Sequence, residues 1–136
     1  MSEKTIRLYG RTLYPGKVTA EALVSTKPLE GFANVNPAKG YTTERNHPLF
    51  KVPYTGKVLV YPSARGSGGF LMYGMGGEAK AAAFIHTENC PLNVAAAAAA
   101  HIPAMTEFDR DPVSVIATGD TVFVNADVGY IEITKK

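Results

Sequence analysis

Hydrophobic and polar residues alternate along the first half of the chain in short runs that are typical of β-strands. Residues 5–8 form one candidate strand, and residues 17–24 alternate over most of their length, which predicts a strand with one buried face. Residues 57–61 form a nearly continuous apolar run between Gly56 and Pro62, which predicts a short strand buried on both faces. The first half is therefore expected to be rich in strands.

The second half of the chain alternates between helical and extended patterns. Residues 70–75 predict a helix, and residues 91–100 predict another because a proline at the start and six consecutive alanines favour helix formation. The extended patterns predict strands at residues 81–86, 102–105, 121–125 and 128–133, and the last two are expected to form a hairpin around residues 126–127.

Length and composition indicate a single globular unit. The chain has 136 residues, of which 46% are hydrophobic and 19% charged, as is usual for globular proteins. We expect one domain over residues 1–136, a mixed α/β fold in which a barrel-like β layer packs on an α/β layer. Because a chain of this size has little room for a pocket walled on every side, a partner chain is expected to complete any active site.

Charge and apolar runs argue against several classes of function. Fourteen Lys and Arg against twelve Asp and Glu give a net charge of +2, too little for a strongly basic nucleic-acid-binding surface. No run approaches the ~20 apolar residues of a membrane span, and the first ten residues lack the apolar run of a secretory signal. We therefore expect a cytoplasmic protein without nucleic-acid or membrane partners.

The strongest candidate for chemistry is the glycine-rich segment that follows the apolar run ending at Pro62. Its glycines allow the backbone to approach a ligand closely, and its arginine can hold a carboxylate through two hydrogen bonds. Ligands of α/β sheets bind at the carboxyl ends of strands, and helix N-termini attract anions. We therefore predict an anion cradle with a hydroxyl group at its centre. The cradle consists of Arg65, Gly66, Ser67, Gly68 and Gly69.

The residues alone leave several roles open for Ser67. Its hydroxyl group could cap a helix, bind an anion, or act as a base if strong positive charge lies close by. The plainer alternative makes Ser67 an N-cap and the neighbouring glycines a tight turn. The segment lacks the Gly-Lys-Ser/Thr that a P-loop requires.

The three histidines lack the spacing of metal ligands, so no metal site is expected within this chain. His86 ends a predicted strand and is expected at the surface. His101 follows the alanine-rich helix and is expected near its last carbonyl groups. His47 lies in the long segment of residues 27–51, whose prolines and glycines forbid a long helix, and it is either a substrate ligand or a turn residue. Cys90, the only cysteine, is expected to be structural.

Several short motifs occur in an order that resembles the small subunit of the aconitase X family. The resemblance covers roughly residues 5–133 and rests on the ordered combination rather than on any single motif. That small subunit resembles the swivelling domain of aconitase, which implies a swivelling β/β/α fold. The motifs are Glu21-Ala22-Leu23-Val24, Asn36-Pro37 with Gly40, His47-Pro48-Leu49, Gly56-Lys57-Val58-Leu59-Val60 and Arg65-Gly66-Ser67.

The resemblance implies a two-chain hydro-lyase. Members of the family dehydrate small hydroxylated carboxylates or phosphorylated acids, and their larger subunit holds an iron–sulfur cluster. By resemblance, this chain closes over a cluster or iron ion held by a large cluster-binding subunit, in a heterodimer or larger assembly, and binds none alone. Ser67 matches the family's proton acceptor and Arg65 the arginine beside it. Asn36 and His47 are further candidates for contact with a small-molecule carboxylate substrate.

The sequence departs from the family pattern at three places, one of which is the stretch of residues 68–73, more apolar here than the serine-rich stretch of the family. Asn36 stands where the family usually has an aspartate, and Ala64 stands where it usually has a glycine. The family includes cis-3-hydroxy-L-proline dehydratase and mevalonate 5-phosphate dehydratase, and we expect the substrate here to be cis-3-hydroxy-L-proline or a related hydroxy acid. The alternative function is a non-catalytic module that binds an anion or docks a partner through the same Arg-Gly-Ser-Gly-Gly segment.

Overall fold

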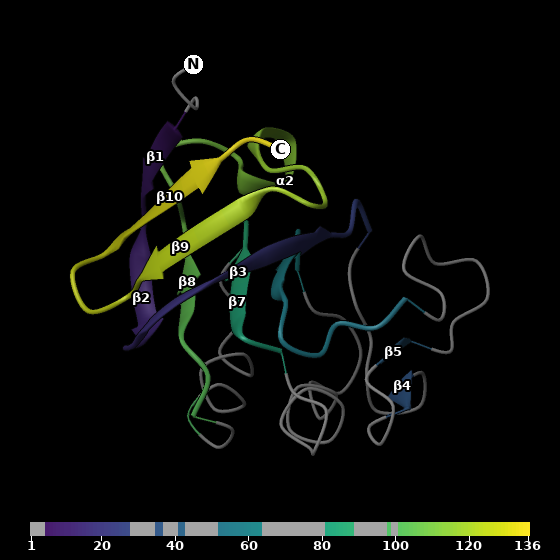
Figure 1. Cartoon of the computed structure of the whole chain (residues 1–136). Helices are drawn as coiled ribbons and strands as arrows, with labels where there is room; N and C mark the ends of the chain where they lie inside the picture. The colour runs from purple at the N-terminus through teal and green to yellow at the C-terminus, as the bar shows by residue number, and fades with distance from the viewer. Residues whose placement is uncertain are drawn as a thin grey trace.

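Eight strands form one mixed sheet in the computed structural model of the chain (Figure 1). A separate antiparallel pair, β4 Val35–Asn36 and β5 Tyr41–Thr42, lies outside this sheet. The structure describes residues 5–27, 52–63, 81–88, 98 and 101–136, together with the backbone of β4 and β5. The strands of the sheet are β1 Thr5–Tyr9, β2 Arg11–Tyr14, β3 Lys17–Val24, β6 Val58–Tyr61, β7 Ala83–His86, β8 Ala104–Thr106, β9 Thr121–Asn125 and β10 Tyr130–Thr134.

The middle of the sheet is parallel. β3 pairs with β6, β6 with β7, and β7 with β8, all in the parallel sense. Every residue of β6 and β7 is buried, as expected for parallel strands that are covered on both faces. This burial confirms the doubly buried strand that the apolar run at residues 57–61 predicts.

The antiparallel part of the sheet is built around the hairpin of β9 and β10, which confirms the hairpin expected from the sequence. β1 pairs with the outer side of β10, and β3 pairs with the outer side of β9. The connection is longer than expected and spans residues 126–129, because the amide of Gly129 donates to the carbonyl of Asn125 at 2.9 Å. β10 consequently begins at Tyr130, two positions later than the prediction.

The two ends of the sheet are joined through Gly10. β1 and β2 are the terminal strands in the order β1-β10-β9-β3-β6-β7-β8-β2, yet only Gly10 separates them in the chain. Figure 1 shows them as one continuous stretch. The sheet therefore curls until its ends meet, which produces the barrel-like layer expected from the sequence.

Apolar side chains fill both sides of the parallel strands. One cluster lies inside the curled sheet and draws on every strand except β2. The other cluster lies against the outer face of β3, β6, β7 and β8. The inner cluster contains Leu8, Ala22, Val58, Val60, Ala83, Ile85, Met105, Ile116, Val122, Val124, Ala126, Ile131 and Ile133. The outer cluster contains Leu23, Tyr54, Leu59, Tyr61, Ala81, Phe84, Ile102 and Ala104.

Some elements differ from the prediction or lie outside the described residues. β2 was not expected, and β8 begins at Ala104 rather than at residue 102. The short helix α2, Pro112–Val115, is capped by Asp111, whose Oδ1 accepts from the amide of Val113 at 3.1 Å. The helices expected at residues 70–75 and 91–100 lie outside the described residues, apart from Ala98, whose backbone is helical.

Candidate functional site

The carboxyl ends of three parallel strands lie together at one edge of the sheet. β3, β6 and β7 run in the same direction, so their carboxyl ends meet there, and ligands of α/β sheets bind at such edges. β6 ends at Tyr61 at this edge, and the segment that the sequence singles out, residues 65–69, follows four positions later in the chain. We call the described residues at this edge of the sheet the carboxyl edge. It consists of Ser25, Tyr61, Pro62, His86, Thr87 and Glu88.

Backbone hydrogen bonds connect the carboxyl ends of β3, β6 and β7. The amide of Ser25 donates to the carbonyl of Val60 at 2.8 Å. On the other side of β6, the amide of Thr87 donates to the carbonyl of Tyr61 at 3.3 Å, and the amide of Glu88 donates to the carbonyl of Pro62 at 2.9 Å. The chain is thus held from the β3 side as far as Val60 and from the β7 side as far as Pro62, five positions before Ser67.

His86 is fully buried at the carboxyl edge, so the surface position expected from the sequence is wrong. The physical reason is that β7 is covered on both faces, so its last residue stays within the layer. Nδ1 of His86 lies 2.8 Å from the carbonyl oxygen of Glu88. The ring centre of His86 lies 5.3 Å from that of Tyr61, its partner in register on β6.

The protonation state of His86 follows from these contacts. Burial lowers the pKa of His86 to about 4, although the hydrogen bond to the carbonyl of Glu88 acts to raise it. The imidazole is therefore neutral at pH 7. Because a carbonyl oxygen only accepts, Nδ1 must carry the proton, and Nε2 is then an acceptor.

Ser25 and Thr87 are held by side-chain hydrogen bonds. Oγ of Ser25 donates to the carbonyl of Lys27 at 2.6 Å and accepts from the amide of Lys27 at 3.1 Å, which closes a serine turn after β3. Oγ1 of Thr87 donates to Oδ1 of Asp111 at 2.9 Å. The edge is therefore connected to the cap of α2 as well as to its own strands.

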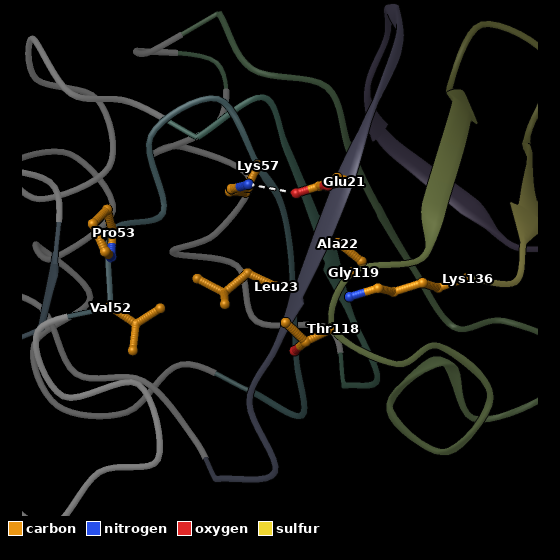
Figure 2. A pocket seen from close by; sticks show the side chains of 9 residues that line it. All are labelled: Glu21, Ala22, Leu23, Val52, Pro53, Lys57, Thr118, Gly119 and Lys136. Atoms are coloured by element: carbon orange, nitrogen blue, oxygen red, sulfur yellow. Dashed lines mark hydrogen bonds and ion pairs between the residues drawn. The ribbon is translucent and has the colours of Figure 1, made fainter.

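An open pocket of about 370 Å³ lies elsewhere, beside β3 and the amino end of β6 (Figure 2). Nζ of Lys57 lies 2.7 Å from Oε2 of Glu21, and this hydrogen bond, with the charge of Lys57, lowers the pKa of Glu21. Since Glu21 balances Lys57, the pocket has little positive charge for an anion beyond that of Lys136. Its lining residues are Glu21, Ala22, Leu23, Val52, Pro53, Lys57, Thr118, Gly119 and Lys136.

Most of the residues predicted for the site lie outside the described ranges. These are Arg65, Gly66, Ser67, Gly68, Gly69 and His47. Asn36 lies on β4, opposite Tyr41 of β5, and only its backbone is described. The structure therefore describes β6, the strand that precedes residues 65–69, but does not describe those residues.

Sequence reasoning missed the polar residues of the carboxyl edge. Ser25, Tyr61 and His86 are all buried there. The available signal was the run Ala81-Ala82-Ala83-Phe84-Ile85-His86, whose lack of alternation is typical of a doubly covered strand and predicts a buried final residue.

The described contacts of His101 involve Ala98 and Tyr14. Its backbone amide donates to the carbonyl of Ala98 at 3.3 Å, and its Nδ1 lies 2.9 Å from the hydroxyl oxygen of Tyr14. The His101 backbone has φ 57°, in the left-handed region that often ends a helix.

Neither a metal site nor a membrane span is found in the part of the chain that the structure describes. Within those ranges, no three His, Cys, Asp or Glu side chains gather closely enough to bind a metal ion. The described residues therefore do not fit an iron–sulfur cluster. No helix among them combines the length and apolar character that a membrane crossing requires.

The curled mixed sheet and its parallel carboxyl edge define a swivelling, β-rich domain of the aconitase type. The model of the aconitase X swivel domain matches residues 7–133. The chain therefore belongs to the aconitase X swivel domain family, as the sequence motifs predict.

Relatives and solved structures agree with this assignment. The chain is 37% identical, over 96% of its length and 93% of the relative, to a phosphomevalonate dehydratase small subunit from Methanosarcina mazei. It is 34% identical to a protein of the same name from Thermococcus kodakarensis, over 94% of this chain and 96% of the relative. It superposes on the aconitase X of Thermococcus kodakaraensis with a TM-score of 0.85 and 30% identity, covering 96% of this chain and 99% of that one. The predicted class, a subunit of an aconitase X type hydro-lyase, is confirmed.

Proposed function

We propose that this chain dehydrates a small hydroxy acid together with a larger subunit, and that residues 65–69 carry its part of the chemistry. The observation that carries this proposal is the carboxyl edge, where hydrogen bonds from Ser25 to Val60 and from Glu88 to Pro62 hold the end of β6 and the residue after it. A rigid strand end that delivers a glycine-rich segment is a common way to place reacting groups.

In this proposal Ser67 accepts the proton that leaves the substrate carbon. A free serine hydroxyl is a weak base, so the segment must supply positive charge and hydrogen-bond donors around it. Arg65 binds a substrate carboxylate, and the backbone N–H groups of Gly66, Gly68 and Gly69 stabilise the negative charge that develops. Asn36 and His47 contact the remainder of the substrate.

In this proposal the larger subunit supplies the Lewis acid of the reaction. A dehydratase needs a Lewis acid for the departing hydroxyl group as well as a base. We place the iron–sulfur cluster or iron ion on the larger subunit, as the resemblance to the aconitase X family implies. The relatives' names, which call them small subunits, support such a partner.

We place 5-phosphomevalonate first among the candidate substrates. The relatives that are 37% and 35% identical over 96% of this chain are named for it. cis-3-Hydroxy-L-proline, the substrate that the sequence suggested, becomes the second compound to assay. Both are hydroxylated carboxylates, so the roles of Arg65 and Ser67 are the same for either.

The test is anaerobic co-expression of this chain with its large subunit, followed by assay of both substrates. Ser67→Ala should lower kcat by roughly a thousandfold while the assembly stays intact. Ser63→Ala is the matched control in the same connection and should leave kcat unchanged. Lys57→Ala tests the open pocket as a rival location and should also leave kcat unchanged.

Two outcomes would contradict the proposal. Full activity of Ser67→Ala would remove the proposed base. A chain that purifies alone and colourless from a fresh anaerobic lysate would remove the obligate partner. The alternative function, a non-catalytic module that binds an anion through residues 65–69, would then be tested by measuring anion binding with calorimetry.

A further inference from the structure

None of the roles proposed above uses the open pocket beside β3, although it has the size of a site for a small organic molecule. Its volume is about 370 Å³, and Figure 2 shows side chains facing it from both sides of β3. One wall of the pocket is apolar and consists of Leu23, Val52 and Pro53. Val52 is 37% exposed, so a ligand with a hydrocarbon part would remove apolar surface from water there.

Lys136 brings a positive charge to this pocket that no ion pair cancels. Among the described residues, Lys57 is paired with Glu21 at 2.7 Å, whereas the ammonium group of Lys136 has no ion pair. Nζ of Lys136 lies against Gly119, where an added Cβ would be 3.3 Å from it, and Figure 2 shows it pointing toward Leu23. Two ammonium groups against one carboxylate leave the pocket with a net positive charge.

The pKa of Glu21 responds to both ammonium groups, which indicates that the three charges face a common space. The hydrogen bond from Lys57 and the charge of Lys57 lower the pKa of Glu21, and the charge of Lys136 lowers it further. Within the described part of the chain, Lys136 acts on Glu21 through its charge without a hydrogen bond. The N–H groups of Lys136 are therefore available to a ligand.

Thr118 supplies a second hydrogen-bond donor at the side of the pocket. Its Oγ1 accepts from the amide of Val24 at 2.9 Å, and this bond leaves the hydrogen of the hydroxyl group for a further acceptor. The amide of Gly119 donates to the carbonyl of Ala22 at 3.0 Å, so the turn that carries Thr118 is bonded to β3 at two points. The hydroxyl group of Thr118 consequently has a fixed place.

We propose that this pocket binds a small organic monocarboxylate, with its carboxylate group held by Lys136 and Thr118 and its hydrocarbon part packed on the apolar wall. The charge favours this class, because a phosphate monoester would bring about −1.5 to −2 charges at pH 7 against a single uncompensated ammonium group. A cation would be repelled by Lys136 and Lys57, and the carboxylate of Glu21 already bonds to Lys57. The inference does not depend on the proposed function, because it concerns binding by this chain alone.

The first test compares four probes, since the natural ligand is unidentified. 3-Methylbutanoate, 3-methylbutan-1-ol and the 3-methylbutylammonium ion share one hydrocarbon part and differ in charge, and acetate keeps the charge without that part. Each probe is titrated into the whole chain at pH 7 and low salt, and binding is followed by NMR at the amides of Leu23, Thr118 and Gly119. We expect 3-methylbutanoate to bind with a Kd of roughly 1–10 mM and the other three probes to bind at least about fivefold more weakly.

The second test changes the charge of the pocket in both directions. Lys136→Gln removes the charge and keeps most of the side-chain length, so the binding of 3-methylbutanoate should weaken by about threefold to tenfold. Glu21→Gln releases the ammonium group of Lys57 from its ion pair, so the binding should strengthen by about twofold to fivefold. Lys17→Gln is the matched control and should leave the Kd unchanged, because Lys17 begins the same strand and does not line the pocket.

Opposite changes of the Kd in the Lys136 and Glu21 variants would support the inference. Equal binding of the alcohol and the carboxylate would overturn it, as would the absence of saturable binding of 3-methylbutanoate up to about 50 mM. An unchanged Kd in Lys136→Gln, or an equal loss in Lys17→Gln, would also overturn it. Dehydration by the assembled enzyme is not part of the readout, so a failure of the proposed function is distinguishable from a failure of this inference.

Discussion

Nζ of Lys135 lies 2.5 Å from Oδ2 of Asp120, a residue that is only 2% exposed. The same ammonium group donates to the carbonyl of Val115 at 2.9 Å. The carboxylate of Asp120 also accepts from the amides of Ala117 and Lys136, at 2.8 and 3.0 Å. The pair therefore joins the chain after β10 to the turn before β9, at one end of the curled sheet.

Asp120→Asn should destabilise the fold. Burial acts to raise the pKa of Asp120, but the hydrogen bonds from Lys135, Ala117 and Lys136 outweigh it and hold the pKa below its usual value. An asparagine offers one acceptor atom in place of two and no charge, so we expect a loss of roughly 1.5–3 kcal/mol in the free energy of unfolding, measured with urea at pH 7.

The pH dependence gives an independent check on Asp120. Because its folded pKa is depressed, its contribution is present above the unfolded value of about 3.9 and disappears as the pH falls through the folded value. The difference in stability between wild type and Asp120→Asn should therefore shrink below about pH 4. A difference that stays constant down to pH 3 would contradict this.

His86 should make the fold less stable as the solution becomes acidic. Its pKa is held at about 4, below the ~6.5 of an exposed imidazole, so between these values the unfolded chain binds a proton that the folded chain excludes. The free energy of unfolding should fall across this window by up to roughly 3 kcal/mol, and His86 should contribute no slope above it.

The measurement compares urea unfolding at several pH values between 4.5 and 7 for wild type and His86→Gln. The Gln variant should show the shallower dependence on pH. Parallel slopes for wild type and His86→Gln would show that His86 becomes protonated in the folded chain.

Gly16→Ala should be costly at the turn between β2 and β3. Gly16 has φ 142°, and a Cβ there would lie 2.6 Å from Cγ of the rigid ring of Pro103. We expect a loss of roughly 1–3 kcal/mol in urea unfolding. Gly56→Ala is the matched control, because Gly56 also has a positive φ, 70°, but a Cβ there meets nothing within 4 Å. An equal loss for both variants would show that backbone strain alone accounts for the effect.

Elements with a clear local pattern could be predicted from the sequence. The alternation in residues 17–24 gave β3 with its bounds, and the apolar run before Pro62 gave β6. The hairpin of β9 and β10 also followed from its alternation, but its turn did not. The bond from Gly129 to Asn125 extends that turn by two residues, and no pattern of hydrophobic positions reveals it.

Features that depend on distant contacts could not be predicted. β2 has no alternation strong enough to show it, and it becomes a strand because it pairs with β8. The burial of His86 likewise depends on layers that cover β7 on both sides. The grouping of Ser25, Tyr61 and His86 at one edge arises from strand order, which the sequence does not display.

The placement of β10 has a consequence for how the protein is made. β10 lies between β1 and β9, so the first strand finds its partner only after the last strand has been synthesised. Ile131 and Ile133 of β10 also fill the interior together with Leu8 of β1. The sheet therefore closes only after the ribosome has released residues near position 134, and until then the apolar strands β6 and β7 lack their inner covering. Pairing across such sequence separations is slow, so closure of the sheet between β1 and β10 is expected to be a late step in the folding of the chain.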